Sequence, residues 1–295
     1  MPELDVKELV ELVARQVLER LGHPSAQPGA PGGDTRNPLI AANWKMNASK
    51  DELPAYVAEL AATGPGVDVL VLPPSVLLPG VRAELARAGR PDIAVGAQDL
   101  HWEAQGAHTG ELSGSLLREV GARWTLVGHS ERRAAGETDD QVRRKLHAGL
   151  DAGLAVMLCV GELAQERRTG ATFRVLRSQL LAALGDTALQ PPDPPRLAVA
   201  YEPVWAIGTG LVATLEQIQE AAAFVRRVIA ELYDWNRARR IRVLYGGSVN
   251  ASNAAEVMSA PDVNGLLVGG ASLSGRSFRE IVEAAPPGPH SEVGR

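Results

Sequence analysis

Short apolar runs alternate with helical stretches along most of the chain. From residue 39 onward, eight such runs occur, and each is followed by apolar positions at helical spacing. The runs are continuous rather than alternating, which is typical of parallel strands that helices cover on their outer face. Within residues 39–284 this pattern predicts an α/β fold, a (β/α)8 barrel, whose usual length is about 250 residues. The predicted strands are Leu39–Trp44, Val67–Leu72, Ile93–Gln98, Trp124–Gly128, Leu154–Val160, Leu197–Glu202, Ile241–Gly246 and Val263–Val268.

The residues before the barrel have a different pattern. Residues 3–21 predict an amphipathic helix, and residues 22–37 are rich in Pro and Gly, which predicts a flexible linker. A lone amphipathic helix is marginal in water, so it is expected to find a partner surface on another molecule, on its own barrel or on a second copy. The apolar stripe of this helix comprises Val6, Leu9, Val10, Val13, Val17 and Leu21.

These patterns divide the chain into four parts. Residues 1–21 are the amphipathic helix and a candidate docking peptide, and residues 22–37 are the linker. Residues 38–284 form the barrel, and residues 285–295 are predicted to be a disordered tail. The first part lacks the cationic start and continuous apolar core of a secretory signal.

Composition narrows the class of protein. The chain has 295 residues, of which 45% are hydrophobic and 22% charged, with a net charge of -5. Acidic and basic residues are interspersed, so the sequence shows no basic patch of the kind that binds nucleic acid. No apolar run is long enough to cross a membrane. The single cysteine, Cys159, excludes an intrachain disulfide and fits a reducing compartment such as the cytoplasm. Because it lies in an apolar run, we expect a buried strand residue rather than a reactive thiol.

In such a barrel, chemistry collects at the C-terminal ends of the strands. At the first end, Asn43 and Lys45 offer an amide and a cation, which a phosphorylated substrate or a developing oxyanion needs. At the fourth end, His129 and Ser130 precede a predicted helix. The positive potential at the N-terminus of that helix would disfavour the charged imidazolium, so His129 could act as a neutral hydrogen-bond donor. Glu131 can pair with Lys45. Taken alone, a lysine at a strand end would be a solvated surface residue, and a lone histidine would more often be structural. Beside Ser130, Glu131 and two arginines at a strand end, His129 is expected to be functional.

The sixth end combines a carboxylate with a loop suited to act as a lid. Glu202 follows a buried run, and Pro203 stops the strand because it has no N–H to donate. Trp205 and Ile207 make the loop apolar, and Gly208 and Gly210 flank Thr209. A carboxylate beneath such a lid loses water and becomes a stronger base. The alternative is a buried glutamate paired with an arginine, next to an ordinary loop.

Glycines dominate the last two strand ends. Gly246 and Gly247 follow the seventh strand, and Gly269 and Gly270 follow the eighth. Bare backbone N–H groups at helix starts suit a phosphate, and phosphate sites in these barrels commonly lie at these two ends. At the third end, the long loop of residues 106–113 suits insertion into another subunit, although it could simply be exposed. The fifth end, Cys159 to Glu162, is predicted to be structural.

Together, the segment Asn43–Asn47, the His129 segment, the Glu202 lid and both glycine pairs resemble the triosephosphate isomerase family over residues 38–284. The resemblance implies an intramolecular aldose–ketose isomerase of glycolysis and gluconeogenesis that acts on a triose phosphate through an enediolate. It implies Glu202 as the base, His129 as the electrophile, and Lys45 and Asn43 as substrate binders. The phosphate would be bound by Gly208, Ser248, Gly269 and Gly270, and the supporting residues would be Ser130 and Glu131.

The resemblance also implies a homodimer in which the Thr109 loop contacts the flank of the neighbour's active site. It implies no metal and no cofactor. Isomerisation of a longer phosphosugar, such as a tetrulose phosphate, remains an alternative, as does a non-catalytic scaffold. The intact set of Lys45, His129 and Glu202 argues against the scaffold. The departures from the family pattern are Ala42 for Gly, Asp99 for Asn, His108 for Phe, and Leu211 and Ser274 for Lys.

The N-terminal helix and linker resemble, in layout, the encapsulation peptides that carry enzymes into bacterial microcompartments. This second resemblance implies a shell or assembly partner for residues 3–21, and a place for the enzyme inside such a compartment. The alternative is a helix that folds back on its own barrel.

Overall fold

The computed structural model describes residues 36–185, 196–208 and 211–288. The predicted N-terminal helix, nearly all of the predicted linker, and Thr209 and Gly210 of the predicted lid lie outside these residues. No helix in the described part of the chain has the length and apolar character needed to cross a membrane.

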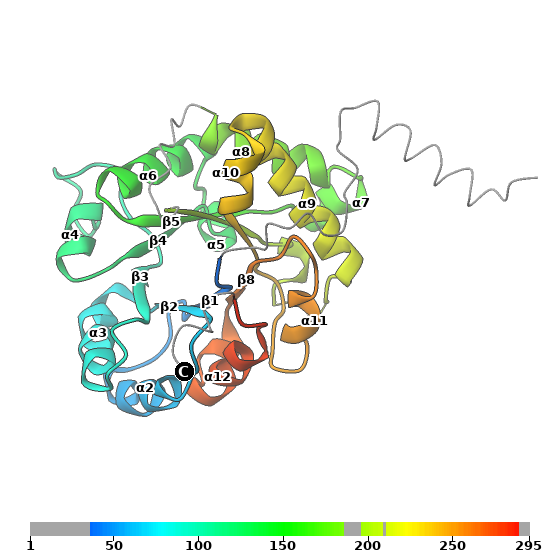
Figure 1. The fold of residues 1–295 in the computed structure, drawn as a ribbon. Coiled ribbons are helices and arrows are strands. Elements are labelled where there is room, and N and C mark those ends of the chain that lie inside the picture. The colour runs from blue at the N-terminus through cyan, green and yellow to red at the C-terminus, as the bar shows by residue number, and fades with distance from the viewer. Residues whose placement is uncertain (1–35, 186–195, 209–210, 289–295) are drawn as a thin grey trace, which may run out of the picture. The chain divides into compact units, whose positions relative to one another are not determined.

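Within the described residues, eight parallel strands close into a barrel, in which β1 pairs with both β2 and β8 (Figure 1). The predicted (β/α)8 fold is confirmed. Observed strand boundaries differ from the predicted ones by up to two residues, because backbone pairing ends before the apolar run does. The strands are β1 (Leu39–Asn43), β2 (Asp68–Leu72), β3 (Ala94–Ala97), β4 (Trp124–Val127), β5 (Ala155–Val160), β6 (Leu197–Tyr201), β7 (Arg242–Tyr245) and β8 (Gly265–Val268).

Helices surround the barrel as an outer ring (Figure 1). Several begin at a side chain that accepts a backbone N–H of the first turn, as Ser113, Thr138, Thr214 and Ser274 do. The helices are α2 (Leu53–Ala61), α3 (Leu78–Arg87), α4 (Gly114–Glu119), α5 (Ser130–Ala134), α6 (Asp139–Asp151), α7 (Ala164–Arg168), α8 (Thr172–Leu184), α9 (Leu215–Leu232), α10 (Trp235–Arg240), α11 (Ala254–Met258) and α12 (Gly275–Ala284).

Strand residues alternate between two apolar cores. Ile40 and Ala42 belong to the larger core, which includes residues of the helices, whereas Leu39 and Ala41 belong to the smaller one formed almost wholly by strands. Cys159 lies in the smaller core and is fully buried, as predicted, and burial raises the pKa of its thiol well above the usual value. Because both faces of each strand are packed, the strand ends form a rigid frame.

The chain remains attached to the barrel just after α12. Ala285 is buried, and Gly288 donates its N–H to the carbonyl of Gly66 at 2.8 Å. The disordered tail predicted from residue 285 therefore cannot begin there, because a packed side chain and a backbone hydrogen bond hold residues 285–288. Residues 289–295 lie outside the described part of the chain.

Candidate active site

The predicted site residues from five different strand ends line one cavity of about 290 Å³. Such a volume suits a small molecule. Those residues are Asn43, Lys45, His129, Glu202, Gly208, Ser248, Gly269 and Gly270. The closed barrel brings them together because each lies at or after the C-terminal end of a strand.

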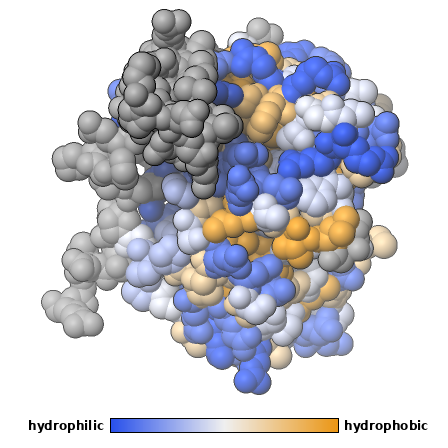
Figure 2. Space-filling view, turned by 90° about the vertical axis from the view of Figure 1, so that its right-hand side faces the viewer, coloured by the Kyte–Doolittle hydropathy of each residue, from blue (hydrophilic) through white to orange (hydrophobic). Residues whose placement is uncertain are grey.

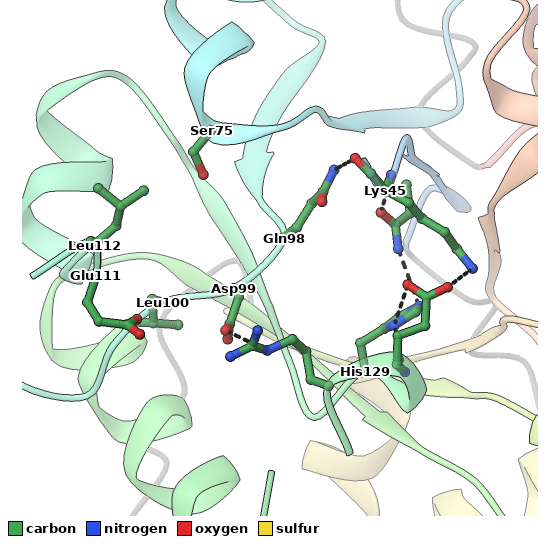
Figure 3. Close-up of a pocket in the computed structure, with 12 residues that line it drawn as sticks. Lys45, Ser75, Gln98, Asp99, Leu100, Glu111, Leu112 and His129 are labelled. Carbon is green, nitrogen blue, oxygen red and sulfur yellow. Dashed lines mark hydrogen bonds and ion pairs between the residues drawn. The ribbon is translucent and has the colours of Figure 1, made fainter. Parts of the chain in front are cut away.

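Lys45 is held in an unusual backbone conformation at the end of β1. Its φ of 52° is left-handed, which typically costs a non-glycine residue about 1–3 kcal/mol. Two side chains hold this conformation: Gln98 donates from Nε2 to the Lys45 carbonyl at 2.9 Å, and Asn43 Oδ1 accepts the Lys45 N–H at 3.0 Å. The ammonium donates to Glu131 at 2.7 Å, which confirms the predicted pair (Figure 3). The sequence indicated Gln98 only as the end of a predicted strand, and nothing in it signalled this role.

His129 caps the N-terminus of α5. Its Nδ1 accepts the N–H of Glu131 at 3.2 Å, which leaves Nε2 to carry the proton of the neutral ring. Nε2 lies 3.0 Å from Glu202 Oε1. Burial lowers the pKa of His129, but the Glu202 carboxylate outweighs burial, so the pKa is raised overall. The Glu202 carboxylate thus opposes the effect expected from the helix terminus on this pKa, because it lies closer to His129 than the sequence indicated.

Glu202 is nearly fully buried, with 2% of its surface exposed. Its Oε2 accepts the N–H of Ser130 at 2.9 Å, and its Oε1 faces His129. These contacts differ from the alternative interpretation, in which an arginine would balance the carboxylate. A Cβ on Gly246 would come within 3.0 Å of Glu202 Cγ, so this glycine makes room for the base.

The loop after Glu202 is anchored by a buried carboxylate. Trp205 donates its indole N–H to Glu162 Oε1 at 2.9 Å, and Tyr201 donates its hydroxyl to the same oxygen at 3.1 Å. The guanidinium of Arg167 lies 5.4 Å from the centre of the Trp205 ring. Glu162, predicted to be structural, is fully buried and fixes the first half of the predicted lid.

The glycine ends lie beside Lys45. A Cβ on Gly269 would lie 3.6 Å from Lys45 Cε, and one on Gly270 would meet no atom within 4 Å. Ser248 donates its hydroxyl to the carbonyl of Ala206 in the lid at 2.9 Å. The arrangement offers backbone N–H groups, a hydroxyl and a cation around one part of the cavity, which is suited to a phosphate.

Apolar side chains are exposed on the surface near the lid. Leu211 and Val212, which follow the lid, are 57% and 55% exposed. Figure 2 shows the side of the molecule that carries α7, α9 and α11, where apolar side chains gather among polar ones.

A second cavity, of about 280 Å³, adjoins the first and shares Lys45 and His129 with it (Figure 3). Gly110, Glu111 and Leu112 form part of its wall, so the loop predicted to contact another subunit lies at its edge. Thr109 is exposed, and the ring of His108 packs against His101 with centroids 4.2 Å apart. Among the described residues, no group of His, Cys, Asp and Glu is arranged to hold a metal ion.

Comparison with known proteins agrees with this geometry. The family model of triosephosphate isomerase matches residues 38–285. The chain belongs to the triosephosphate isomerase family. The prediction of an intramolecular aldose–ketose isomerase is thereby confirmed. Residues 1–37 lie outside the matched range.

Similar triosephosphate isomerases occur in several bacteria. The one from Citrifermentans bemidjiense is 47% identical over 254 residues, which cover 84% of this chain and 98% of the relative. The one from Bradyrhizobium sp. strain BTAi1 is 49% identical over 256 residues, with coverage of 85% and 98%. The one from Acetivibrio thermocellus is 45% identical over 253 residues, with coverage of 84% and 98%.

Proposed function

We propose that the chain interconverts dihydroxyacetone phosphate and glyceraldehyde 3-phosphate through an enediolate, with Glu202 as the base. The observation that carries this proposal is the convergence of Glu202, His129 and Lys45 on one small cavity. Glu202 removes a proton from the carbon next to the carbonyl, and returns it to the neighbouring carbon. His129, through Nε2–H, and Lys45 polarise the carbonyl and stabilise the enediolate. His129 and Ser130 both contact the Glu202 carboxylate and so fix the position of the base.

The phosphate is held by Gly208, Ser248, Gly269 and Gly270. This assignment is supported by the position of all four residues on the wall of the cavity that Lys45 also lines. The lid closes over the phosphate and keeps it in the plane of the enediolate, because out-of-plane geometry would favour its elimination. Ser130 and Glu131 support the reaction by contacting Glu202 and Lys45 respectively.

A turnover assay on triose and tetrulose phosphates tests the substrate. The small cavity and the triosephosphate isomerase relatives favour the triose. We expect kcat/KM for glyceraldehyde 3-phosphate to exceed that for a tetrose phosphate by at least about tenfold, since an added carbon group changes pocket fit by about 1–3 kcal/mol. Faster turnover of the longer sugar would replace the substrate assignment but keep the reaction type.

We also propose that the chain acts as a homodimer, with the Thr109 loop against the neighbour's second cavity. Two nearly fully exposed apolar side chains support this proposal, since Met46 is 95% and Val76 is 87% exposed. Both follow strand ends next to residues that line this cavity, Lys45 and Ser75. An exposed apolar surface beside an active site is typical of a subunit interface.

For residues 3–21 we propose docking to a microcompartment shell or to an assembly, with the enzyme placed there through its linker. The support is the amphipathic pattern, the Pro/Gly-rich linker of residues 22–37, and the match of the family model to residues 38–285 alone. An isomerase bound in this way would act in the cytoplasm or within such a compartment.

A further inference from the structure

Asp99, at the C-terminal end of β3, joins two helices that follow it in the chain. Its Oδ1 and Oδ2 accept the ammonium of Lys145 at 2.7 and 2.8 Å. Oδ2 also forms an ion pair with Nε of Arg132 at 2.9 Å. Arg132 lies in α5, and Lys145 lies in α6 with only 3% of its surface exposed. One carboxylate therefore binds cations from both helices.

A second carboxylate completes the cluster. Glu137, in the turn between α5 and α6, accepts the same Lys145 ammonium at 2.5 Å, and its side chain is only 4% exposed. Lys145 thus bridges Asp99 on the barrel and Glu137 just after α5, while Arg132 joins α5 to Asp99 directly. Two cations face two carboxylates, so the charges of the cluster are balanced. The short helix α5 is therefore connected to Asp99 at two points. Arg132 within the helix contacts Asp99 directly, and Glu137 after the helix is connected to Asp99 through Lys145.

The position of α5 matters because its first turn carries the proposed chemistry. His129 is its N-cap, Ser130 donates its N–H to Glu202, and Glu131 binds Lys45. Gln98, the residue before Asp99, holds the strained backbone of Lys45. Neighbouring side chains at one strand end therefore hold both sides of the cavity, Lys45 through Gln98 and the His129 helix through Asp99 (Figure 3).

We infer that Asp99 is a positioning residue for the isomerisation, acting through Arg132 and Lys145 on the helix that carries His129. This inference rests on the proposed function of His129 and Lys45. An Asn at this position would have one acceptor oxygen and an NH2 group that can only donate. Its NH2 group would face one of the two cations, where an acceptor is needed. The loss of the carboxylate charge would also leave the cluster with one excess positive charge. The carboxylate is therefore suited to this chain's pairing of Arg132 and Lys145.

The test compares Asp99→Asn with Asp262→Asn. Asp262 is a matched control, because it accepts from Arg226 Nε at 2.6 Å and its side chain is 24% exposed, against 22% for Asp99. It contacts Arg226 of α9 rather than α5. We expect Asp99→Asn to lower kcat about tenfold with KM within about twofold, because displaced catalytic groups slow the chemical step. Asp262→Asn should lower Tm and leave kcat unchanged. Arg132→Gln, which removes a half-exposed partner, should lower kcat about threefold in a folded protein.

Three outcomes overturn the inference. These are an unchanged kcat in Asp99→Asn, an unchanged kcat in Arg132→Gln if Asp99→Asn does not fold, or an equal loss of kcat in Asp262→Asn. Triose phosphate turnover by the wild-type protein and by Glu202→Gln is measured first. If the wild type turns over and Glu202→Gln does not, an unchanged Asp99→Asn rejects the positioning role and leaves the proposed function standing.

Discussion

At the scale of single residues, the cavity pairs a base with an electrophile before substrate binds. Glu202 Oε1 lies 3.0 Å from His129 Nε2, and both side chains are buried. The Glu202 carboxylate therefore favours the protonated form of the His129 ring.

The pKa of His129 is expected to fall in Glu202→Gln. In the wild type, burial lowers this pKa and the Glu202 carboxylate raises it further than burial lowers it. The substitution removes the carboxylate and leaves burial unopposed. Titration of the His129 ring by NMR measures the change, with the other histidines as internal references. A pKa unchanged or higher in the variant would contradict the pairing.

The same shift predicts a pH dependence of stability. Because the folded-state pKa of His129 lies above the unfolded value of about 6.5, the pairing stabilises the fold fully below that unfolded value. The contribution is lost as pH rises through the folded-state pKa. The free energy of unfolding of the wild type, relative to Glu202→Gln, should therefore decline across this window.

At the scale of elements, the buried Glu162 carboxylate is one of the groups that hold the first half of the lid. Trp205→Phe removes the indole N–H that Glu162 accepts but keeps an apolar ring. We expect faster hydrogen exchange at residues 204–208, unchanged exchange in β5 and β6, and a stability loss of about 1 kcal/mol. Trp235→Phe is the control, because Trp235 lies in α10 and is 43% exposed. Unchanged exchange in the lid, or the same increase in the control, would contradict the anchoring role.

How far the sequence predicted these elements depends on the kind of signal. Continuous apolar runs predicted all eight strands, since burial on both faces leaves a pattern in the chain. Their ends were less certain, as for Ile93–Gln98 against the observed Ala94–Ala97, because hydropathy does not report where pairing stops. Glu202, His129 and Lys45 could be found because each follows a strand. The roles of Gln98 and Glu162 could not be predicted from the sequence, because their partners, such as Lys45 and Trp205, come from other strand ends and loops.

At the scale of the whole molecule, association is expected to depend on the exposed loop of residues 106–113. Thr109→Arg places a charge at the loop tip, where the proposed interface would bury it. We expect weaker association in sedimentation and lower activity at micromolar concentration. Arg168→Glu, an exposed change in α7, serves as a control and should associate normally. A wild-type chain that is monomeric at this concentration would contradict the dimer.

The proposed docking role of residues 3–21 is tested apart from catalysis. Residues 1–37 fused to a fluorescent protein should carry it into shell particles of the same host, because the helix supplies an aliphatic stripe and the linker spans roughly 20–25 Å. The barrel without these residues should stay active. A fusion that stays diffuse, with a truncated barrel whose Tm is lower by several degrees, would show that the helix packs on its own barrel.

The central claim is that Glu202 is the proton acceptor of an isomerase, and Glu202→Gln tests it most directly. The substitution keeps the shape of a nearly fully buried side chain and removes only the base. We measure kcat for glyceraldehyde 3-phosphate together with the affinity for an unreactive phosphate-bearing inhibitor. The account predicts a loss of roughly 10²–10⁴ in kcat, with affinity within about threefold of the wild type. A kcat within about tenfold of the wild type would contradict it.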